Sequence, residues 1–318
     1  MNIVVIGTSG LLGNAIAAQF AARGHSVTSA ARQGADIAVD FRFDLDVEAM
    51  RAVVRGADVA VNAVGILVER DGNTWDGVHR RAAQVLAQAC EAERVARVVH
   101  ISALGADTGI AGGFMASKLA AEQAFEQHAV DYAIVRPGLL VDAMCPSTRL
   151  FRVLARLPVI ALPDLLHPGA SPVAPIQVAD VAQCVVRIAE HEKALRRVIE
   201  LAGPEVMTYR RMLARYRADQ GRGAALWLPL PWWLMKATSV LARMLPQKVF
   251  SIDTVRMLQA GSIARRNEAA RWLGREPLPL LSPALRAAGP VVSLSTPPFR
   301  RSAPCASNPP QNRATTDA

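Results

Sequence analysis

The sequence predicts an α/β fold, a doubly wound parallel sheet followed by a smaller C-terminal lobe and a disordered tail. β-branched runs alternate with segments of helical periodicity, a glycine-rich turn joins the first strand to the first helix, and the pattern changes after Pro137. With 318 residues, 51% of them hydrophobic, the chain is long enough to bury a sizeable core. We expect a first domain over residues 1–137, a lobe over 138–281 that is interleaved with the end of the sheet, and a tail over 282–318.

The first domain shows its elements in a regular order. Residues 2–6 (NIVVI) form a β-branched run that ends in a glycine-rich turn, and LLGNAIAAQFAARG then has helical periodicity closed by Gly24. The further strand-like runs are SVTSAA, VAVNAV, RVVHIS and YAIVRP. Helices are expected near residues 46–55, 76–93 and 116–128. This alternation is typical of a parallel sheet covered by helices.

The lobe has short apolar runs broken by prolines, followed by elements near residues 178–191, 197–203 and 208–220. Its most apolar stretch, residues 226–245, is interrupted by prolines and by Lys236 and Arg243, which argues against a membrane-spanning helix. Two alternatives stay open for this stretch. It packs on the first domain, or it contacts a protein partner, a membrane complex or a membrane surface. The tail is rich in Pro, Ser, Ala and Asn, a composition typical of disorder.

Composition limits the classes of partner. The formal charge is +9, which suits an anionic ligand, but the arginines are scattered and no nucleic-acid-binding module accompanies them, so nucleic-acid binding is not expected. The four cysteines are far apart, a pattern that fits neither a disulfide framework nor a metal site. The first residues lack the pattern of a signal peptide. We therefore expect a cytoplasmic protein, with a peripheral position at the inner face of a membrane as the alternative.

The turn GTSGLLG is the main binding motif. Its glycines follow the order G-x-x-G-x-x-G between a strand and a helix, where they permit a tight turn, close approach to a pyrophosphate and close helix–strand packing. The context makes dinucleotide binding a stronger interpretation than a merely structural turn. The residues expected at the phosphates are Gly7, Ser9, Gly10, Leu11, Leu12 and Gly13.

The end of the second strand should decide which dinucleotide binds. The sequence there is TSAARQG, with Arg32 and no carboxylate for a ribose 2′-hydroxyl. A guanidinium suits a 2′-phosphate, so NADP(H) is favoured over NAD(H), unless Arg32 points into solvent. Asp40 and Phe41 form the next expected contact, with the Asp40 carboxylate accepting from the adenine amino group or serving as a turn residue.

Seven segments carry a resemblance to a known family: GTSGLLG, NAVGI, HISALGA, ASKLAAE, IVRPGLLV, PIQVADVAQCV and ELAGPEVMTYRRML. Through them the chain resembles the short-chain dehydrogenase/reductase superfamily, in its extended and atypical, epimerase/dehydratase-like branches. It is most similar to the atypical group that contains the dehydrogenase-like accessory subunit of respiratory complex I and its bacterial relatives. The resemblance covers about residues 1–260 and implies a Rossmann-type fold.

The resemblance also implies roles for individual residues. Ser102 falls at the position of the catalytic serine or threonine, and Lys118 matches the lysine whose ammonium binds the nicotinamide ribose. The adenosine side of the cleft and the turn beside the nicotinamide would be formed by Asn62, Ala63, Gly65, Pro137 and Gly138.

Phe114 departs from the family pattern, since active members carry a tyrosine there that donates the proton. Of the alternative donors, Ser117 should face elsewhere on the helix, Ser102 is a weak acid alone, and Tyr132 starts a buried strand. We expect His100, which precedes Ser102 on the same strand, to point to the opposite face as a hydrogen-bonded core histidine.

Three functional hypotheses follow. The first is a protein that holds NADP(H) in a structural or sensing role and offers its tryptophan-bearing lobe to a partner. The second is an active NAD(P)H-dependent oxidoreductase, epimerase or dehydratase that uses another acid or water. The third is a redox-sensing regulator that changes partner with the state of the nucleotide. Whether the protein is an enzyme therefore stays open.

Overall fold

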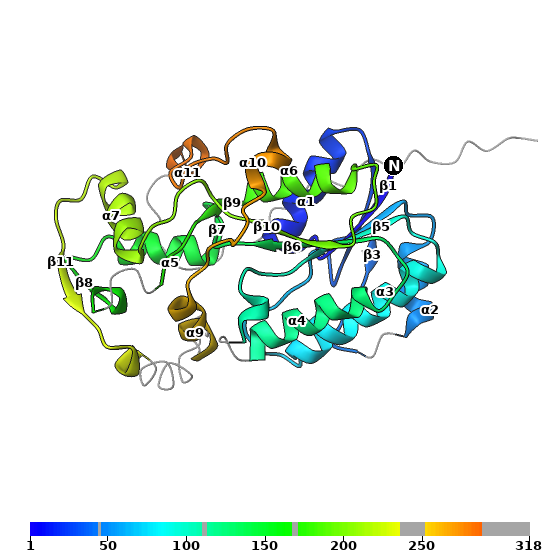
Figure 1. The fold of residues 1–318 in the computed structure, drawn as a ribbon, viewed down its shortest axis with the longest axis horizontal. Coiled ribbons are helices and arrows are strands. Elements are labelled where there is room, and N and C mark those ends of the chain that lie inside the picture. The colour runs from blue at the N-terminus through cyan, green and yellow to red at the C-terminus, as the bar shows by residue number, and fades with distance from the viewer. Residues whose placement is uncertain (44–45, 110–112, 167–170, 236–251, 288–318) are drawn as a thin grey trace, which may run out of the picture.

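The computed structural model describes residues 1–287 apart from four short segments, and residues 288–318 are not described (Figure 1). The segments left out are 44–45, 110–112, 167–170 and 236–251.

A seven-stranded parallel sheet forms the centre of the described part of the chain. Its strands are β1 (Asn2–Ile6), β2 (Ser26–Ala31), β3 (Ile37–Ala38), β4 (Val59–Asn62), β5 (Arg97–Ile101), β6 (Tyr132–Pro137) and β10 (Arg197–Leu201). The strand order is β10-β6-β5-β4-β1-β2-β3, and every neighbouring pair is parallel. The predicted doubly wound α/β fold is therefore confirmed. The order reverses between β1 and β4, where the carboxyl ends of such strands leave a crevice for a ligand.

Helices cover both faces of this sheet (Figure 1). One face is packed by α1 (Leu11–Ala22), α6 (Val178–Ala189) and α10 (Ala269–Leu273). The other is packed by α2 (Val47–Val54), the π-helix η1 (Asp76–Arg81), α3 (Ala82–Ala92) and α4 (Gly113–Glu126). Fully buried side chains such as Phe20 and Phe125 fill the two interfaces. A short 3₁₀ turn, η2 (Ala106–Thr108), lies between β5 and α4.

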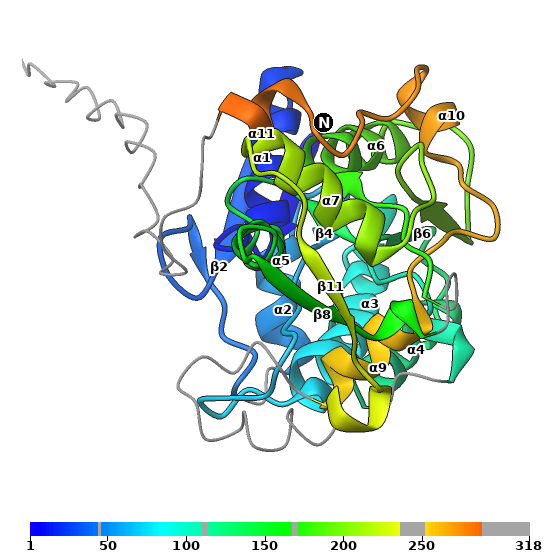
Figure 2. The ribbon, with the colours of Figure 1, turned by 90° about the vertical axis from the view of Figure 1, so that its left-hand side faces the viewer.

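The C-terminal lobe lies beyond the carboxyl edge of the sheet (Figures 1 and 2). Its elements are β7 (Leu140–Val141), α5 (Pro146–Leu154), β8 (Val159–Leu162), η3 (Pro163–Leu165), β9 (Ile176–Gln177), α7 (Tyr209–Asp219), β11 (Leu226–Pro229) and α9 (Ile252–Ala260). Tyr216 and Met212 are fully buried in a core of the lobe's own. β8 and β11 pair in parallel and leave Val159 and Leu226 exposed side by side.

The apolar stretch of residues 226–245 is described only in its first part. Residues 226–229 form β11, and Trp233 is 69% exposed. Among the described residues, no helix has both the length and the hydropathy that crossing a membrane requires.

The start of the predicted tail is folded. Residues 283–287 form helix α11 (Pro283–Ala287), and Leu285 is buried in the core of the lobe. The expectation of disorder from Ser282 onward is wrong for these residues. Overall composition does not show that a single leucine, Leu285, is buried in the core of the lobe. The rest of the expected tail lies outside the described residues.

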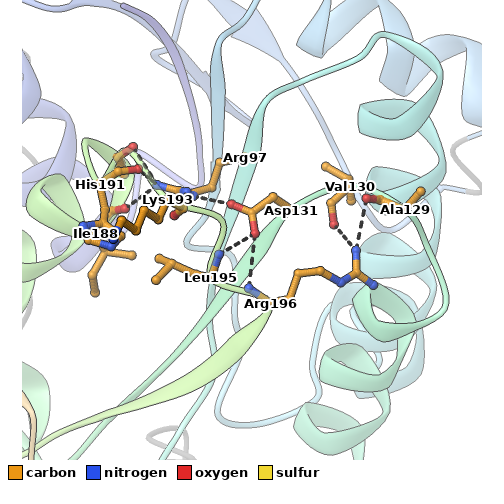
Figure 3. Close-up of polar contacts among 10 residues, drawn as sticks. Arg97, Ala129, Val130, Asp131, Ile188, His191, Lys193, Leu195 and Arg196 are labelled. Carbon is orange, nitrogen blue, oxygen red and sulfur yellow. Dashed lines mark hydrogen bonds and ion pairs between the residues drawn. The ribbon is translucent and has the colours of Figure 1, made fainter.

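The amino edge of the sheet is closed by three side chains, Arg97, Asp131 and Arg196, which we call the amino-edge cluster (Figure 3). The guanidinium of Arg97 donates to the Asp131 carboxylate and to carbonyl oxygens at the end of α6 and in the segment after it. Asp131 also accepts from the backbone N–H groups of Leu195 and Arg196. These contacts hold the loop before β10 against β5 and β6.

Candidate functional site

The glycine turn between β1 and α1 has the close packing that its spacing predicts. Gly7 has φ +98°, and a Cβ built on Gly13 would lie 2.3 Å from the Gly7 carbonyl oxygen. α1 begins after Gly10 with no side-chain cap and no acidic residue in its first turn. The backbone N–H groups of Leu11 and Leu12 therefore face no side-chain acceptor of their own helix end, which suits an anion. Ser9 is exposed on the same turn.

Three charged side chains meet beyond β2 and β3. Arg42 donates from Nε to the Asp40 carboxylate at 2.8 and 3.0 Å, and this hydrogen bond lowers the pKa of Asp40, with a smaller contribution from the charge of Arg32. Arg32 itself is exposed. The sequence analysis predicted Arg32, Asp40 and Phe41 at this place and missed Arg42. The position of Arg42, two residues after Asp40, already favoured a contact with that carboxylate.

The loop after β4 lies between the glycine turn and α4. A Cβ on Gly7 would lie 2.9 Å from the Ala63 carbonyl carbon, so Gly7 and Ala63 are in direct backbone contact. Asn62 is buried at the end of β4 and its side-chain oxygen accepts from Val64 N–H. A Cβ on Gly65 would lie 3.2 Å from Lys118 Nζ. Gly65 was expected on the adenosine side, and the structure places it beside the lysine.

His79 of the π-helix η1 connects this loop to α4. Its Nε2 accepts from Ile66 N–H at 3.1 Å, which assigns the proton to Nδ1. Nδ1 then donates to Ser117 Oγ at 2.8 Å, and that hydroxyl donates to the Phe114 carbonyl oxygen at 2.7 Å. Burial and the nearby Lys118 charge lower the pKa of His79 to about 2, so the ring is neutral. Nothing in the local sequence signalled His79.

Phe114 occupies an apolar setting. Its side chain is buried, and its ring meets those of His79 and Trp75 edge to face, with centroids 5.6 and 6.5 Å away. Ala103, Ala106, Met115 and Met257 complete the cluster. Lys118, one helical turn later on α4, is the polar neighbour that the spacing predicts.

Lys118 and Glu122 reach two consecutive residues at the carboxyl end of β5. Lys118 Nζ donates to the Ile101 carbonyl oxygen at 3.1 Å, and Ser102 Oγ donates to Glu122 Oε1. All three side chains are buried. Burial lowers the pKa of Lys118 to about 8, and the charge of Glu122 partly opposes this fall.

Glu122 is also one half of a buried ion pair. Arg136 Nε donates to Glu122 Oε1 at 2.9 Å, and another guanidinium nitrogen of Arg136 lies 2.9 Å from Asp107 Oδ2. Asp107 in turn lies 3.3 Å from Arg265, which is exposed. We call Ser102, Asp107, Lys118, Glu122 and Arg136 the carboxyl-edge cluster. Glu122 follows Lys118 by four residues, so its place on the same helix face was readable from the sequence.

The turn after β6 closes the site against the lobe. Leu104 N–H donates to the Pro137 carbonyl oxygen at 3.0 Å, and Gly138 N–H donates to that of Leu201 at 2.8 Å. A Cβ on Gly138 would lie 3.2 Å from the Ala174 carbonyl oxygen. Pro137 and Gly138 therefore sit where β5, β6 and β10 end together.

His100 does not lie as expected. It precedes Ser102 by two residues, and because strand side chains alternate, the two share a face. The ring of His100 packs on Phe125 of α4 with centroids 5.0 Å apart, so the predicted opposite face is wrong. The expectation of a hydrogen-bonded histidine is also wrong, since neither ring nitrogen has a partner among the described residues.

The serine hydroxyls and the imidazole nearest Phe114 all donate to other groups. Ser102 donates to Glu122, Ser117 to Phe114, and His79 to Ser117. Tyr132 lies at the amino end of β6, beneath the guanidinium of Arg196. Among the described residues, no group of three or more His, Cys, Asp or Glu side chains could hold a metal ion. The site can therefore bind and orient a dinucleotide, with the Lys118 ammonium as its remaining proton source.

Three proteins are similar to this chain in sequence or in fold. The mitochondrial NADH dehydrogenase (ubiquinone) 1 alpha subcomplex subunit 9 of Arabidopsis thaliana is 25% identical over 83% of this chain and 71% of its own length. An NADPH-dependent quinone oxidoreductase from Escherichia coli, complexed with NADPH, has a TM-score of 0.71 at 16% identity, over 91% of this chain and 98% of its own. A nucleoside-diphosphate-sugar epimerase from Staphylococcus aureus has a TM-score of 0.70 at 16% identity, over 88% and 98%. The last two likenesses show the fold alone.

The predicted similarity to the complex I subunit group is confirmed by the Arabidopsis relative, and the two solved structures agree with the predicted Rossmann-type fold. The model of a family described as NAD(P)H-binding matches residues 7–192, from the first glycine of the turn to just beyond α6. The chain therefore belongs to the NAD(P)H-binding family.

Proposed function

We propose that the protein holds NADP(H) as a structural or sensing ligand and does not reduce carbonyl compounds at a useful rate. The observation that carries this is that Ser102, Ser117 and His79 each donate to another group, and that His79 is neutral. A positioned general acid contributes roughly 10²–10⁴-fold to such reactions. A tightly bound nucleotide still stabilises the folded state by mass action, a role that requires no chemistry.

The residues present fit a dinucleotide at several points. The uncapped start of α1 and the Gly7–Gly13 contact suit a pyrophosphate. Lys118 Nζ lies beside Gly65 and makes one hydrogen bond within the described residues, so it would have N–H donors for ribose hydroxyls. When bound, the nucleotide would supply a hydride. Lys118 would orient the ribose, and Phe114 and Trp75 would exclude water on one side of the site.

A preference for NADP(H) is supported by the charges beyond β2. Arg32 and Arg42 flank Asp40, whose carboxylate is taken up by Arg42 and is less available to a ribose hydroxyl. A 2′-phosphate would gain charge-assisted hydrogen bonds from the two guanidinium groups.

A second candidate function is reduction of an acceptor with Lys118 as the acid. The lowered pKa of Lys118, about 8, makes its ammonium a better proton donor near neutral pH than an ordinary lysine. The likeness in fold to a quinone oxidoreductase and to a sugar epimerase supports testing quinones and nucleotide sugars beside carbonyl compounds.

The direct test is calorimetric titration of the full chain with NADPH and with NADH, followed by turnover assays on the three acceptor classes. We expect one site, tighter for NADPH, and no turnover. Lys118→Met should weaken both nucleotides, whereas Lys193→Met, which removes an exposed lysine at the opposite edge of the sheet, should weaken neither. Turnover that Lys118→Met abolishes would instead support the second candidate.

Two further variants test the finer points. Phe114→Ala should leave affinity nearly unchanged, and Phe114→Tyr should at most introduce slow carbonyl reduction. Arg32→Ala combined with Arg42→Ala should weaken NADPH by about tenfold or more and leave NADH unchanged. Equal losses for both nucleotides would contradict the role in binding a 2′-phosphate.

We also propose that the lobe presents its exposed apolar strands and Trp233 to a protein partner, at a peripheral position on a membrane complex. The similarity to a complex I subunit and the exposure of Leu226, Leu228 and Trp233 support this. Capture of partners from a lysate with and without NADPH tests it. A partner that binds only with or only without NADPH would favour the sensing role. If a partner still binds after Trp233→Ser, use of this surface would be contradicted.

A further inference from the structure

We propose that Glu122 is a positioning residue of the dinucleotide site: it supplies the counter-charge for the Lys118 ammonium and holds the Ser102 hydroxyl away from the nicotinamide. This inference rests on the proposed dinucleotide binding and assigns a role to the last residue of the ASKLAAE segment, for which the resemblance implied none.

The geometry of α4 is the first reason. Lys118 and Glu122 lie one turn apart on the same face, and they bind consecutive residues at the end of β5. The Lys118 ammonium takes the Ile101 carbonyl oxygen, and the Glu122 carboxylate takes the Ser102 hydroxyl. Both side chains therefore hold the end of β5 by hydrogen bonds. A movement of either one would shift this end and so affect the contacts of the other.

The direction of the Ser102 hydroxyl is the second reason. A hydroxyl has one proton to donate, and Ser102 gives it to Glu122 Oε1. Glu122 is held for this by Arg136, which is itself buried and fixed on its other side by Asp107. The carboxylate cannot turn away without removing one of the two carboxylates that pair with this buried guanidinium, which is costly. In the described part of the site, the Ser102 proton is therefore not free, and the tyrosine is replaced by Phe114.

The charge balance around Lys118 is the third reason. The titratable and charged groups near it are His79 from η1, His100 from β5, Glu122 from α4 and, behind Glu122, Arg136 from β6 and Asp107 from η2. Burial lowers the pKa of both histidines below their ordinary value, so they carry no charge near neutral pH. Glu122 is then the negative charge next to Lys118, and its loss would favour the neutral amine.

The test is the pH dependence of NADPH affinity in the full chain. An ammonium binds ribose hydroxyls and favours the anionic nucleotide, so wild-type affinity should fall as pH rises through the pKa of Lys118, about 8. In Glu122→Gln the midpoint of this fall should move at least half a pH unit lower. Affinity relative to wild type should then be equal near pH 6 and about threefold or more weaker near pH 9. The ratio of variant to wild type cancels the titration of the ligand's own phosphate.

Glu268→Gln is the matched control. Glu268 is buried and pairs with Arg197 at 2.7 and 2.8 Å, on the opposite face of the sheet from α4. It should share any general cost of breaking a buried ion pair and leave the midpoint where it is in wild type. Glu122→Asp keeps the negative charge, so its midpoint should lie close to that of wild type.

The outcomes separate the two proposals. If wild-type protein binds neither nucleotide, the proposed function fails. If it binds NADPH but Glu122→Gln keeps the wild-type midpoint, Glu122 does not act on Lys118 and this inference is overturned. Should Glu122→Gln fail to fold, Glu122→Gln combined with Arg136→Met removes both buried charges, and its midpoint must still lie below that of wild type.

Discussion

The two edges of the same sheet use similar polar residues for different purposes. In the amino-edge cluster, Arg97 donates to Asp131 and to several backbone carbonyls, and Asp131 accepts from two backbone N–H groups as well (Figure 3). In the carboxyl-edge cluster, Lys118 makes one hydrogen bond within the described residues. The ring nitrogens of His100, which lies beside this cluster on β5, have no partner there.

This difference has a simple physical meaning. A buried donor without a partner costs free energy unless a ligand or water completes it, so fully satisfied groups serve stability and incompletely satisfied ones mark a binding site. The amino edge holds loops together, whereas under the proposed function the carboxyl edge keeps the remaining Lys118 donors for a nucleotide. Substitutions at the two edges should therefore separate stability from binding.

The largest effect is expected at the amino edge. Asp131→Ala removes the acceptor for Arg97 Nε and for two backbone N–H groups, and it leaves a buried guanidinium without its counter-charge. Such losses cost about 3–5 kcal/mol of unfolding free energy. Urea unfolding measures this, and NADPH affinity at temperatures where the variant is folded should stay as in wild type. A variant that keeps its stability but loses NADPH would reverse the roles assigned to the two edges.

Lys118→Met, in contrast to Asp131→Ala, should raise the unfolding free energy of the nucleotide-free protein near pH 7. The folded-state pKa of Lys118, about 8, lies below its ordinary value of 10.5, so between these values the unfolded chain binds more protons and wild-type stability rises with pH. The lowering of the Lys118 pKa from 10.5 to about 8 corresponds to roughly 3 kcal/mol of unfolding free energy, which is absent near pH 7 and regained toward pH 10.5. The methionine variant is free of this penalty and should be more stable than wild type near pH 7. Parallel stability curves for the two proteins from pH 7 to 10.5 would show that burial of the ammonium costs nothing.

His79→Gln extends the same test to acid. The folded-state pKa of His79, about 2, lies below its ordinary value of 6.5, so wild type loses stability as pH falls below 6.5. The loss is about 1.4 kcal/mol per pH unit, or about 2 kcal/mol by pH 5, relative to a variant that cannot protonate. Unfolding free energies of both proteins at pH 6.5 and pH 5 measure it, and their difference cancels the contribution of His100. A difference that is the same at both pH values would mean that His79 is protonated in the folded protein.

The sequence could predict the parts of this site that lie close together in the chain. The glycine turn, the four-residue spacing of Phe114 and Lys118 and the strand–helix alternation all follow from short-range rules, and the structure has each of them. Glu122 on the same face as Lys118 follows from the same rule and was overlooked.

The rest depends on contacts between distant segments. Arg136 meets Glu122 and Asp107 because β6, α4 and η2 converge, and His79 reaches Ser117 across 38 residues. No residue spacing encodes such contacts, since they arise from the packing of helices on the sheet. The error on His100 has a different origin, because alternation along β5 was sufficient to place it beside Ser102.

The smallest effect should come from Arg265→Ala, at the outer end of the carboxyl-edge cluster. Arg265 lies 3.3 Å from Asp107, but its side chain is 72% exposed, and such pairs contribute about 0–1 kcal/mol. Its backbone N–H donates to Glu200, a contact that the substitution keeps. Unfolding free energy should therefore change by less than about 1 kcal/mol, with no change in the pH midpoint of NADPH binding. A midpoint that moved would show that charge outside the buried pair of Glu122 and Arg136 reaches Lys118, and the carboxyl-edge cluster would then have to include the lobe.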